Sequence, residues 1–202
     1  MSKGLAILTS GGDSAGMNPA VKCAVDYATL KGYETHLIYD GLRGLIADRI
    51  VPTTRDQVSE MLHRGGTLLR SSRSPEFFDI EVRRVAFENL KRRGIDKLIV
   101  IGGDGSFRAL NQFYSYINDS IGMEARLTVL GHIQRGGSPT VLDRMMAYKF
   151  AVAAVDALDA GQTNSIMIYR DGVYGHLPIH EVADAKYVLD PALLKLASPL
   201  AC

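Results

Sequence analysis

The stretch Lys97-Leu98-Ile99-Val100-Ile101-Gly102-Gly103-Asp104-Gly105-Ser106 joins an apolar run to a glycine-rich turn. The start of the chain repeats this order, with Leu5-Ala6-Ile7-Leu8 followed by Ser10-Gly11-Gly12-Asp13-Ser14-Ala15-Gly16-Met17-Asn18. Each turn leads into a segment with the apolar spacing of a helix. A strand, a glycine turn and a helix N-terminus together present backbone N–H groups to phosphate. Two such turns predict a protein that handles a polyphosphate.

Strand and helix patterns alternate around these turns. Strands are expected at residues 5–9, 34–39 and 96–101, with helices at 19–31, 54–63 and 79–93 and a loop at 40–44. Alternation of this kind predicts an α/β fold with a parallel sheet covered by helices. The helix at 79–93 is expected to bury Val82, Val85, Ala86 and Leu90. Further along, we expect helices at 107–114 and 141–158, strands at 126–130 and 164–169, and a helical segment from Pro191.

The composition is that of an ordinary globular protein. The 202 residues are 47% hydrophobic and 22% charged, with a net charge of +1, which suits one good core or two small ones. A balanced charge argues against a mainly electrostatic nucleic-acid or membrane partner. Cys23 and Cys202 form no disulfide framework, and no signal segment or membrane-spanning window is found. We therefore expect a soluble cytoplasmic protein, with Cys23 as a small core residue.

Each polar motif also has a simpler explanation. Asp104 could hold Mg²⁺ beside phosphate or merely cap a helix. The segment 64–74, with its glycines and arginines, could bind an anion or be a solvated basic loop. The turn at 131–139 could hold phosphate or sugar hydroxyls, or be a capping turn with an incidental His132. The other four histidines have no metal-ligand partners and are interpreted as structural.

Taken together, four motifs resemble one family. They are Leu8-Thr9-Ser10-Gly11-Gly12-Asp13 with Gly16-Met17-Asn18; Gly65-Gly66-Thr67 with Ser72-Arg73; Ile101-Gly102-Gly103-Asp104-Gly105-Ser106; and Thr128-Val129-Leu130-Gly131-His132-Ile133-Gln134-Arg135-Gly136-Gly137-Ser138-Pro139. In their order and amino-acid sequence, these motifs closely resemble those of the ATP-dependent 6-phosphofructokinases of bacterial type. The resemblance covers nearly the whole chain up to about Leu158. Diacylglycerol and NAD kinases share a Gly-Gly-Asp-Gly turn, but the last motif speaks against them.

The resemblance implies a fold and a reaction. The fold would be a three-layer α/β sandwich of the phosphofructokinase type, with two lobes around a cleft. The enzyme would move the γ-phosphoryl of ATP to the 1-hydroxyl of fructose 6-phosphate in glycolysis, with Mg²⁺ as cofactor, as a cytoplasmic homotetramer. Residues 1–114 would form the ATP-binding lobe and 121–158 part of the fructose 6-phosphate lobe. Residues 159–202 would be a C-terminal segment that crosses between the lobes.

The resemblance also implies roles by position. The ATP-binding residues would be Gly11, Gly12, Arg73, Ser74, Gly103, Asp104, Gly105 and Ser106, with Asp104 at the metal. Pyrophosphate-using relatives tend to carry Asp at the position of Gly105, so glycine favours ATP. The sugar phosphate would be held by Arg126, His132, Ile133, Gln134 and Arg135, with Arg126 serving a neighbouring subunit. Lys22, Asp26 and Arg55 would fall at the family's effector site, where a carboxylate at Asp26 disfavours a phosphorylated effector.

A central segment of the family has no counterpart in this sequence. It should carry a Thr-Ile-Asp-Asn-Asp-like motif with the base that deprotonates the sugar, and a Met-Gly-Arg motif that contacts the substrate. Instead, Phe113-Tyr114 is followed within a few residues by Ile121-Gly122-Met123-Glu124. The catalytic base is therefore unknown, and the 202-residue chain is expected to turn over negligibly while still able to bind ATP. A catalytically dead nucleotide-binding protein is the alternative function.

Two explanations of this gap are open. One is a true deletion, and the other is a longer polypeptide that retains the segment. Loss of sheet strands should leave little buried area for a stable domain, which favours the longer polypeptide. An intact mass near 22.0 kDa would exclude it.

Overall fold

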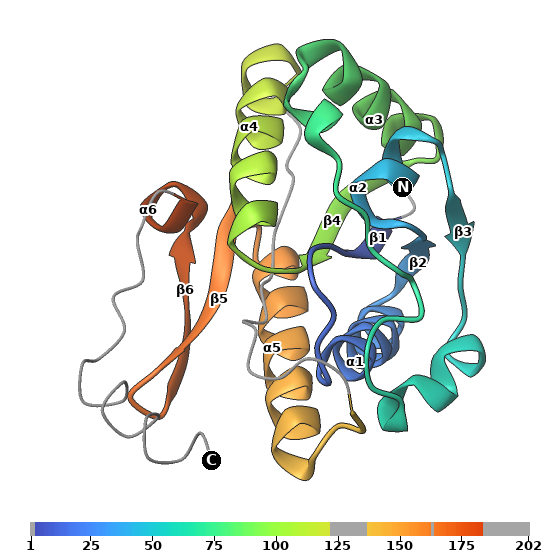
Figure 1. Cartoon of the computed structure of the whole chain (residues 1–202), viewed down its shortest axis with the longest axis vertical. Coiled ribbons are helices and arrows are strands. Elements are labelled where there is room, and N and C mark those ends of the chain that lie inside the picture. The colour runs from blue at the N-terminus through green and yellow to red at the C-terminus, as the bar shows by residue number, and fades with distance from the viewer. Residues whose placement is uncertain (1–2, 122–136, 163, 184–202) are drawn as a thin grey trace, which may run out of the picture.

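A computed structural model describes residues 3–121, 137–162 and 164–183, and its main feature is a four-stranded, mostly parallel sheet (Figure 1). The strand order is β3-β2-β1-β4, and β5 and β6 pair as a separate antiparallel hairpin. The strands are β1 Lys3–Thr9, β2 Tyr33–Ile38, β3 Ile50–Pro52, β4 Ile95–Ile101, β5 Ser165–Arg170 and β6 Val173–Pro178. The α-helices are α1 Met17–Leu30, α2 Gly41–Ile46, α3 Ile80–Arg92, α4 Asp104–Ile121, α5 Val141–Asp159 and α6 Ile179–Ala183; the 3₁₀ helices are η1 Asp56–His63 and η2 Pro75–Phe78.

Alternation along the central strands divides the core into two layers. Leu5 and Ile7 of β1 join a buried cluster with α1, α5 and η1, whereas Ala6 and Leu8 join a second cluster with α2, α3 and α4. Successive side chains of a strand point to opposite faces, so a strand buried on both faces reads as a continuous apolar run. The sheet is therefore covered by helices on both sides, and the mixed α/β fold with a mostly parallel sheet is confirmed.

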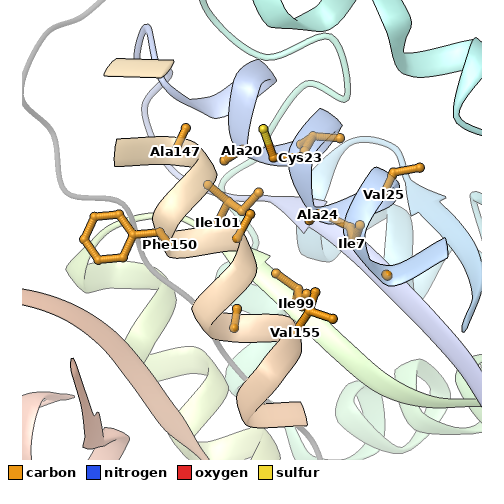
Figure 2. Close-up of a cluster of buried hydrophobic side chains, with 14 of the residues drawn as sticks. Ile7, Ala20, Cys23, Ala24, Val25, Ile99, Ile101, Ala147, Phe150 and Val155 are labelled. Atoms are coloured by element: carbon orange, nitrogen blue, oxygen red, sulfur yellow. The ribbon is translucent and has the colours of Figure 1, made fainter. Parts of the chain in front are cut away.

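Small residues let α1 and α5 pack closely over the sheet (Figure 2). Ala20, Cys23 and Ala24 of α1 and Ala147 of α5 lie in the same cluster as Ile101. Cys23 is 6% exposed, and this burial raises the pKa of its thiol to about 11. Cys23 is a core residue, as the sequence predicted.

The parallel pairing brings the two glycine turns to one edge of the sheet. β1 pairs in parallel with both β2 and β4, and the last residue of β1, Thr9, lies opposite Ile101 at the end of β4. The backbone N–H of Ser10 then donates to the carbonyl of Ile101 at 2.8 Å. The carboxyl edge of β1 and β4 thus carries both predicted motifs.

The expected loop at 40–44 is wrong, because this segment forms helix α2. Its glycines allow close approach of backbone segments, and Gly41 also has a left-handed φ of 60°. A Cβ added to Gly44 would lie 1.5 Å from the carbonyl oxygen of Tyr39, and one added to Gly41 would lie 3.0 Å from that of Thr9. Glycine at these two positions permits close contact between backbone segments at the start of a helix.

The buried face of α3 also differs from the expectation. Val85 is 42% exposed, whereas Phe87 and Asn89 are buried with Ala86 and Leu90. The amide of Asn89 donates to the carbonyl oxygens of Leu45 (2.9 Å) and Ile46 (3.0 Å) at the end of α2. A polar side chain is buried there because it donates to carbonyl groups at the end of the short helix, where that of Leu45 otherwise accepts only a long bond of 3.5 Å from the N–H of Asp48.

In the second half of the chain, the helix at 141–158 and the strand at 164–169 are confirmed as α5 and β5. The helix expected at 107–114 runs on to Ile121, the segment 54–63 forms a 3₁₀ helix, and β3 and β6 were not predicted. The expected strand at 126–130 and the segment from Pro191 lie outside the described residues. Among the described residues, no helix is both long and apolar enough to cross a membrane.

The predicted lobes stay predictions. Helix α5, which was assigned to the segment 121–158, packs in the same buried cluster as α1 of the segment 1–114.

Replacing Asn89 by Ala should lower the free energy of unfolding by about 1–3 kcal/mol, because two carbonyl groups at the end of α2 lose the Asn89 amide as a donor. Urea denaturation measures the change, and Glu88→Ala, an exposed position on the same helix, is the control. Equal effects of the two variants would contradict the assigned role of Asn89.

The buried thiol predicts a pH dependence of stability. The pKa of Cys23 is raised on folding from 9.0 to about 11, so its contribution is complete below pH 9 and is lost as pH rises through 11. The difference in unfolding free energy between wild type and Cys23→Ala should therefore shrink over this range, by about 1.4 kcal/mol per pKa unit. Denaturation curves at pH 8, 9, 10 and 11 measure it, and a constant difference would refute the assignment.

Candidate functional site

The two glycine turns contact each other directly at the sheet edge. The hydroxyl of Ser106, in the first turn of α4, donates to the hydroxyl of Ser10 at 2.8 Å, and both residues are buried. A Cβ on Gly102 would lie 2.6 Å from the carbonyl oxygen of Ser10 and 2.7 Å from the Ser106 hydroxyl. Glycine is required at position 102 because the turns approach this closely.

A pocket of about 420 Å³ opens beside this contact. Small-molecule sites fall in the same range of volume. The pocket brings together six of the predicted ATP-binding residues: Gly11, Arg73, Ser74, Gly103, Gly105 and Ser106. The two others, Gly12 and Asp104, are chain neighbours of lining residues. The segments around Arg73 and Gly103, about 60 and about 90 residues after Gly11, thus line one cavity with it.

Helix α4 begins at this pocket. Its first residue is Asp104, which follows Gly103 of the lining, and the helix runs for 18 residues. The free N–H groups and the positive end of the helix dipole favour a bound anion. A Cβ added to Gly105 would meet no heavy atom within 4 Å, so the space beside this residue is open.

The pocket also has an apolar side that the sequence did not reveal. Leu42, Pro75, Phe78 and Ala109 line it, and Phe78 is 49% exposed. Leu42 was missed because segment 40–44 was expected to be a loop. No local sequence pattern around Phe78 indicates that its side chain lines a pocket. An apolar wall opposite a few polar groups is typical of sites for small organic molecules.

The basic segment 64–74 is anchored rather than freely solvated. The fully buried Asn18 donates to the carbonyl oxygens of Arg64 (3.0 Å) and Gly65 (3.1 Å), and its own oxygen accepts from the N–H of Leu68 (2.8 Å). Two of the three arginines are paired, Arg64 with Glu60 and Arg70 with Asp40. The third, Arg73, lines the pocket. If this segment binds an anion in the pocket, Arg73 is the arginine placed to contact it.

The end of the fourth motif lies beside this segment. The carbonyl oxygen of Gly137 approaches Gly65 so closely that a Cβ on Gly65 would be 1.6 Å from it. Thr140 then caps α5 by accepting from the N–H of Asp143 at 3.2 Å, in a capping box. The predicted sugar-phosphate residues Arg126, His132, Ile133, Gln134 and Arg135 lie outside the described residues.

The three predicted effector residues are brought together away from this pocket. Asp26 forms ion pairs with Lys22, one helical turn before it, and with Arg55, whose Nε lies 3.3 Å from its Oδ1. One carboxylate thus sits between both cations, which reduces the positive charge they offer to an anion.

Comparison with known proteins identifies the family. A family model described as phosphofructokinase matches residues 4–118 and 110–158. An ATP-dependent 6-phosphofructokinase of Sulfurimonas denitrificans is 30% identical over 312 residues, covering 95% of this chain and 98% of that protein. One of Wolinella succinogenes is 28% identical over 316 residues, covering 97% and 99%. The chain belongs to the phosphofructokinase family.

Solved structures support the fold. The phosphofructokinase of Saccharomyces cerevisiae matches with a TM-score of 0.77 at 20% identity over 89% of this chain, which spans only 45% of the yeast chain. A pyrophosphate-dependent phosphofructokinase from Marinobacter aquaeolei matches with a TM-score of 0.70 at 12% identity, over 90% of this chain and 84% of that one. The fold is that of the phosphofructokinases.

The comparisons also locate a break in the match. The alignment to the Sulfurimonas protein is 312 positions long, whereas this chain has 202 residues, so much of that relative has no counterpart here. The family model matches in two parts that overlap at residues 110–118. This is where the sequence analysis placed the missing central segment.

Two glycines of the Gly102–Gly105 turn should respond oppositely to alanine. Gly102→Ala forces a methyl group against Ser10 and Ser106 and should cost about 1–3 kcal/mol of stability. Gly105→Ala meets open space at the start of α4 and should be neutral, or stabilising by up to about 1 kcal/mol. Thermal and urea denaturation compare the pair, and an equal loss in both would contradict the described contact.

Proposed function

We propose that the chain binds MgATP in the pocket at the carboxyl edge of β1 and β4, as the donor side of a 6-phosphofructokinase. The observation that carries this proposal is the convergence of the two glycine turns with Arg73 and Ser74 around one cavity that also has an apolar wall. A polyphosphate needs backbone N–H groups and a guanidinium, and a nucleobase needs an apolar surface. Both kinds of surface are present on this cavity.

Different residues of the pocket would contact the phosphates and the apolar part of the nucleotide. The N–H groups of the turns at Gly11 and Gly103 and the start of α4 receive phosphate oxygens, and Arg73 adds a bidentate donor. Leu42 and Phe78 offer their surface to the apolar part of the nucleotide. Mg²⁺ is held by one or two carboxylates together with phosphate oxygens in sites of this kind, and Asp104 at the start of α4 is the residue proposed for it. When bound, the ion neutralises phosphate charge during transfer.

The donor is proposed to be ATP rather than pyrophosphate. The open space at Gly105 leaves room for a nucleotide beyond the phosphates. Both bacterial relatives are named ATP-dependent 6-phosphofructokinases, whereas the Marinobacter neighbour of similar fold is named pyrophosphate-dependent. The higher sequence identity lies with the ATP-dependent proteins.

The acceptor is proposed to be fructose 6-phosphate, phosphorylated on its 1-hydroxyl in glycolysis. Arg126, His132, Ile133, Gln134 and Arg135 would hold it, since imidazole, amide and guanidinium groups match a sugar phosphate. Arg126 would serve a neighbouring subunit of a cytoplasmic homotetramer. The description of the two relatives as 6-phosphofructokinases supports this part.

A second candidate is a protein that binds the nucleotide without turnover. The observation in its favour is the two-part match to the family model, because the segment between those parts should supply the base and the substrate loop. Positioning and charge alone do not remove the proton from the attacking hydroxyl.

Calorimetric titration with ATP in the presence of Mg²⁺ tests the donor site. Wild type should bind ATP, and Gly105→Asp should weaken binding at least tenfold, because a carboxylate enters the space beside the phosphates. Gly105→Ala, which adds no charge, is the matched control and should retain affinity. No binding by wild type, or equal affinities of Gly105→Asp and wild type, would refute the proposal.

A coupled assay with ATP and fructose 6-phosphate separates the two candidates. ATP binding without product, in a protein whose intact mass is near 22.0 kDa, supports the binding-only function. Turnover that depends on fructose 6-phosphate supports the kinase and contradicts the expectation of negligible activity.

A further inference from the structure

One wall of the nucleotide pocket is formed by Ser72, Arg73 and Ser74, which belong to none of the helices or strands. Arg70, two residues before Ser72, has a φ of 61°. Across the sheet edge, Asp40, between β2 and α2, has a φ of 62°. Left-handed backbone is unfavourable for residues other than glycine and persists only where surrounding contacts hold it. These two residues hold each other.

The side chains of Arg70 and Asp40 form a bidentate ion pair. Nε of Arg70 lies 2.7 Å from Oδ1 of Asp40, and Nη2 of Arg70 donates to Oδ2 at 3.2 Å. Arg49 donates to the same Oδ2. Burial opposes ionisation of Asp40, but the hydrogen bonds from Arg49 and Arg70 outweigh it and lower the pKa of this carboxyl group. Asp40 is therefore a carboxylate at neutral pH.

The main chain of Asp40 holds the same wall at two further points. Its N–H donates to the carbonyl oxygen of Leu69 at 2.8 Å, and its carbonyl oxygen accepts from the hydroxyl of Ser72 at 2.7 Å. The Ser72 hydroxyl also lies 3.1 Å from that of Ser74. Asp40 thus contacts the segment before, at and after Arg70.

An exposed ion pair contributes little to stability, and the Arg70 side chain is 65% exposed. The Asp40 side chain, in contrast, is only 18% exposed, and Thr9 at the end of β1 donates to the carbonyl oxygen of Arg70 at 2.8 Å. The backbone of Arg70 is held by the last residue of β1, and its side chain is held by Asp40, two residues after the end of β2. This arrangement fixes geometry more than it adds stability.

We propose that Asp40 is a positioning residue of the nucleotide site, which acts through Arg70 and Ser72 to hold Ser72, Arg73 and Ser74 against the pocket. This role rests on the proposed binding of ATP. Loss of the Asp40 charge should weaken contacts of this wall with the phosphates and spare the apolar wall. The affinity for ATP should therefore fall more than the affinity for AMP.

Asp40→Asn tests this role, because asparagine tolerates the left-handed conformation and matches aspartate in size. We expect ATP affinity to fall about tenfold, the loss of about 1.4 kcal/mol that one charge-assisted hydrogen bond can supply, and the ratio of AMP to ATP dissociation constants to fall with it. In an Arg70→Gly background, Asp40→Asn should cause little further loss. Additive losses, or an unchanged ratio, would overturn the proposal.

Asp48→Asn is the matched control. Asp48 also has a left-handed φ, 57°, and its carboxylate is also held by two arginines, Arg92 and Arg93, but it does not line the pocket. It should change stability without changing the affinity for ATP. An equal loss of ATP affinity in both variants would reveal a general structural effect and contradict the proposal.

Amide hydrogen exchange decides the role independently of ATP. Exchange of residues 70–74 should quicken in Asp40→Asn and not in Asp48→Asn, at matched global stability. If wild type binds no ATP, the proposed function fails, while faster exchange confined to this segment still supports the positioning role. Unchanged exchange overturns it.

Discussion

The close contact between two glycine turns at the carboxyl edge of β1 and β4 determines the rest of the site. Gly102 can approach the carbonyl of Ser10 only because it lacks a side chain, and the Ser106 hydroxyl then donates to that of Ser10. The contact depends in turn on parallel pairing that places Thr9 opposite Ile101. With the turns fixed, the start of α4 and the segment before η2 enclose a cavity whose surface is part backbone, part guanidinium and part hydrocarbon.

Much of this arrangement could be predicted from local sequence. Apolar runs that are buried on both faces indicate strands of a parallel sheet, and the glycine turns after them indicate an anion site at its edge. The helical pattern of α5 and the apolar character of Cys23 were also predicted from the sequence. These features depend on residues close together in the sequence, where periodicity and turn chemistry carry the signal.

Other features depend on contacts between distant segments. The glycines of α2 were interpreted as turn residues, although their role is to admit the Tyr39 and Thr9 carbonyls. Asn89 gave no signal because its partners lie more than 40 residues earlier, at the end of α2. The apolar wall at Leu42 and Phe78 and the link from Asp40 to Arg70 likewise appear only when the chain is folded. Tertiary context decides such positions, and no local pattern encodes it.

The chain belongs to the phosphofructokinase family, but its match to the family model breaks at residues 110–118. The described sheet nevertheless has apolar clusters on both faces. The cavity is lined by the turns that follow β1 and β4, by α2, by the first residues of α4 and by the segment before α3. The last of its lining residues in the sequence, Ala109, precedes the break. The proposed donor site therefore does not use the missing segment, so binding of ATP can be tested separately from transfer of its phosphoryl group.

Backbone amide chemical shifts during a titration with MgATP test the central claim most directly. The account predicts that the largest changes fall on Gly11, Gly103, Gly105 and Ser106 and on the Arg73–Ser74 pair, with small changes at Lys22, Asp26 and Arg55. Saturating shifts centred on those three effector residues, with the two glycine turns unmoved, would contradict it.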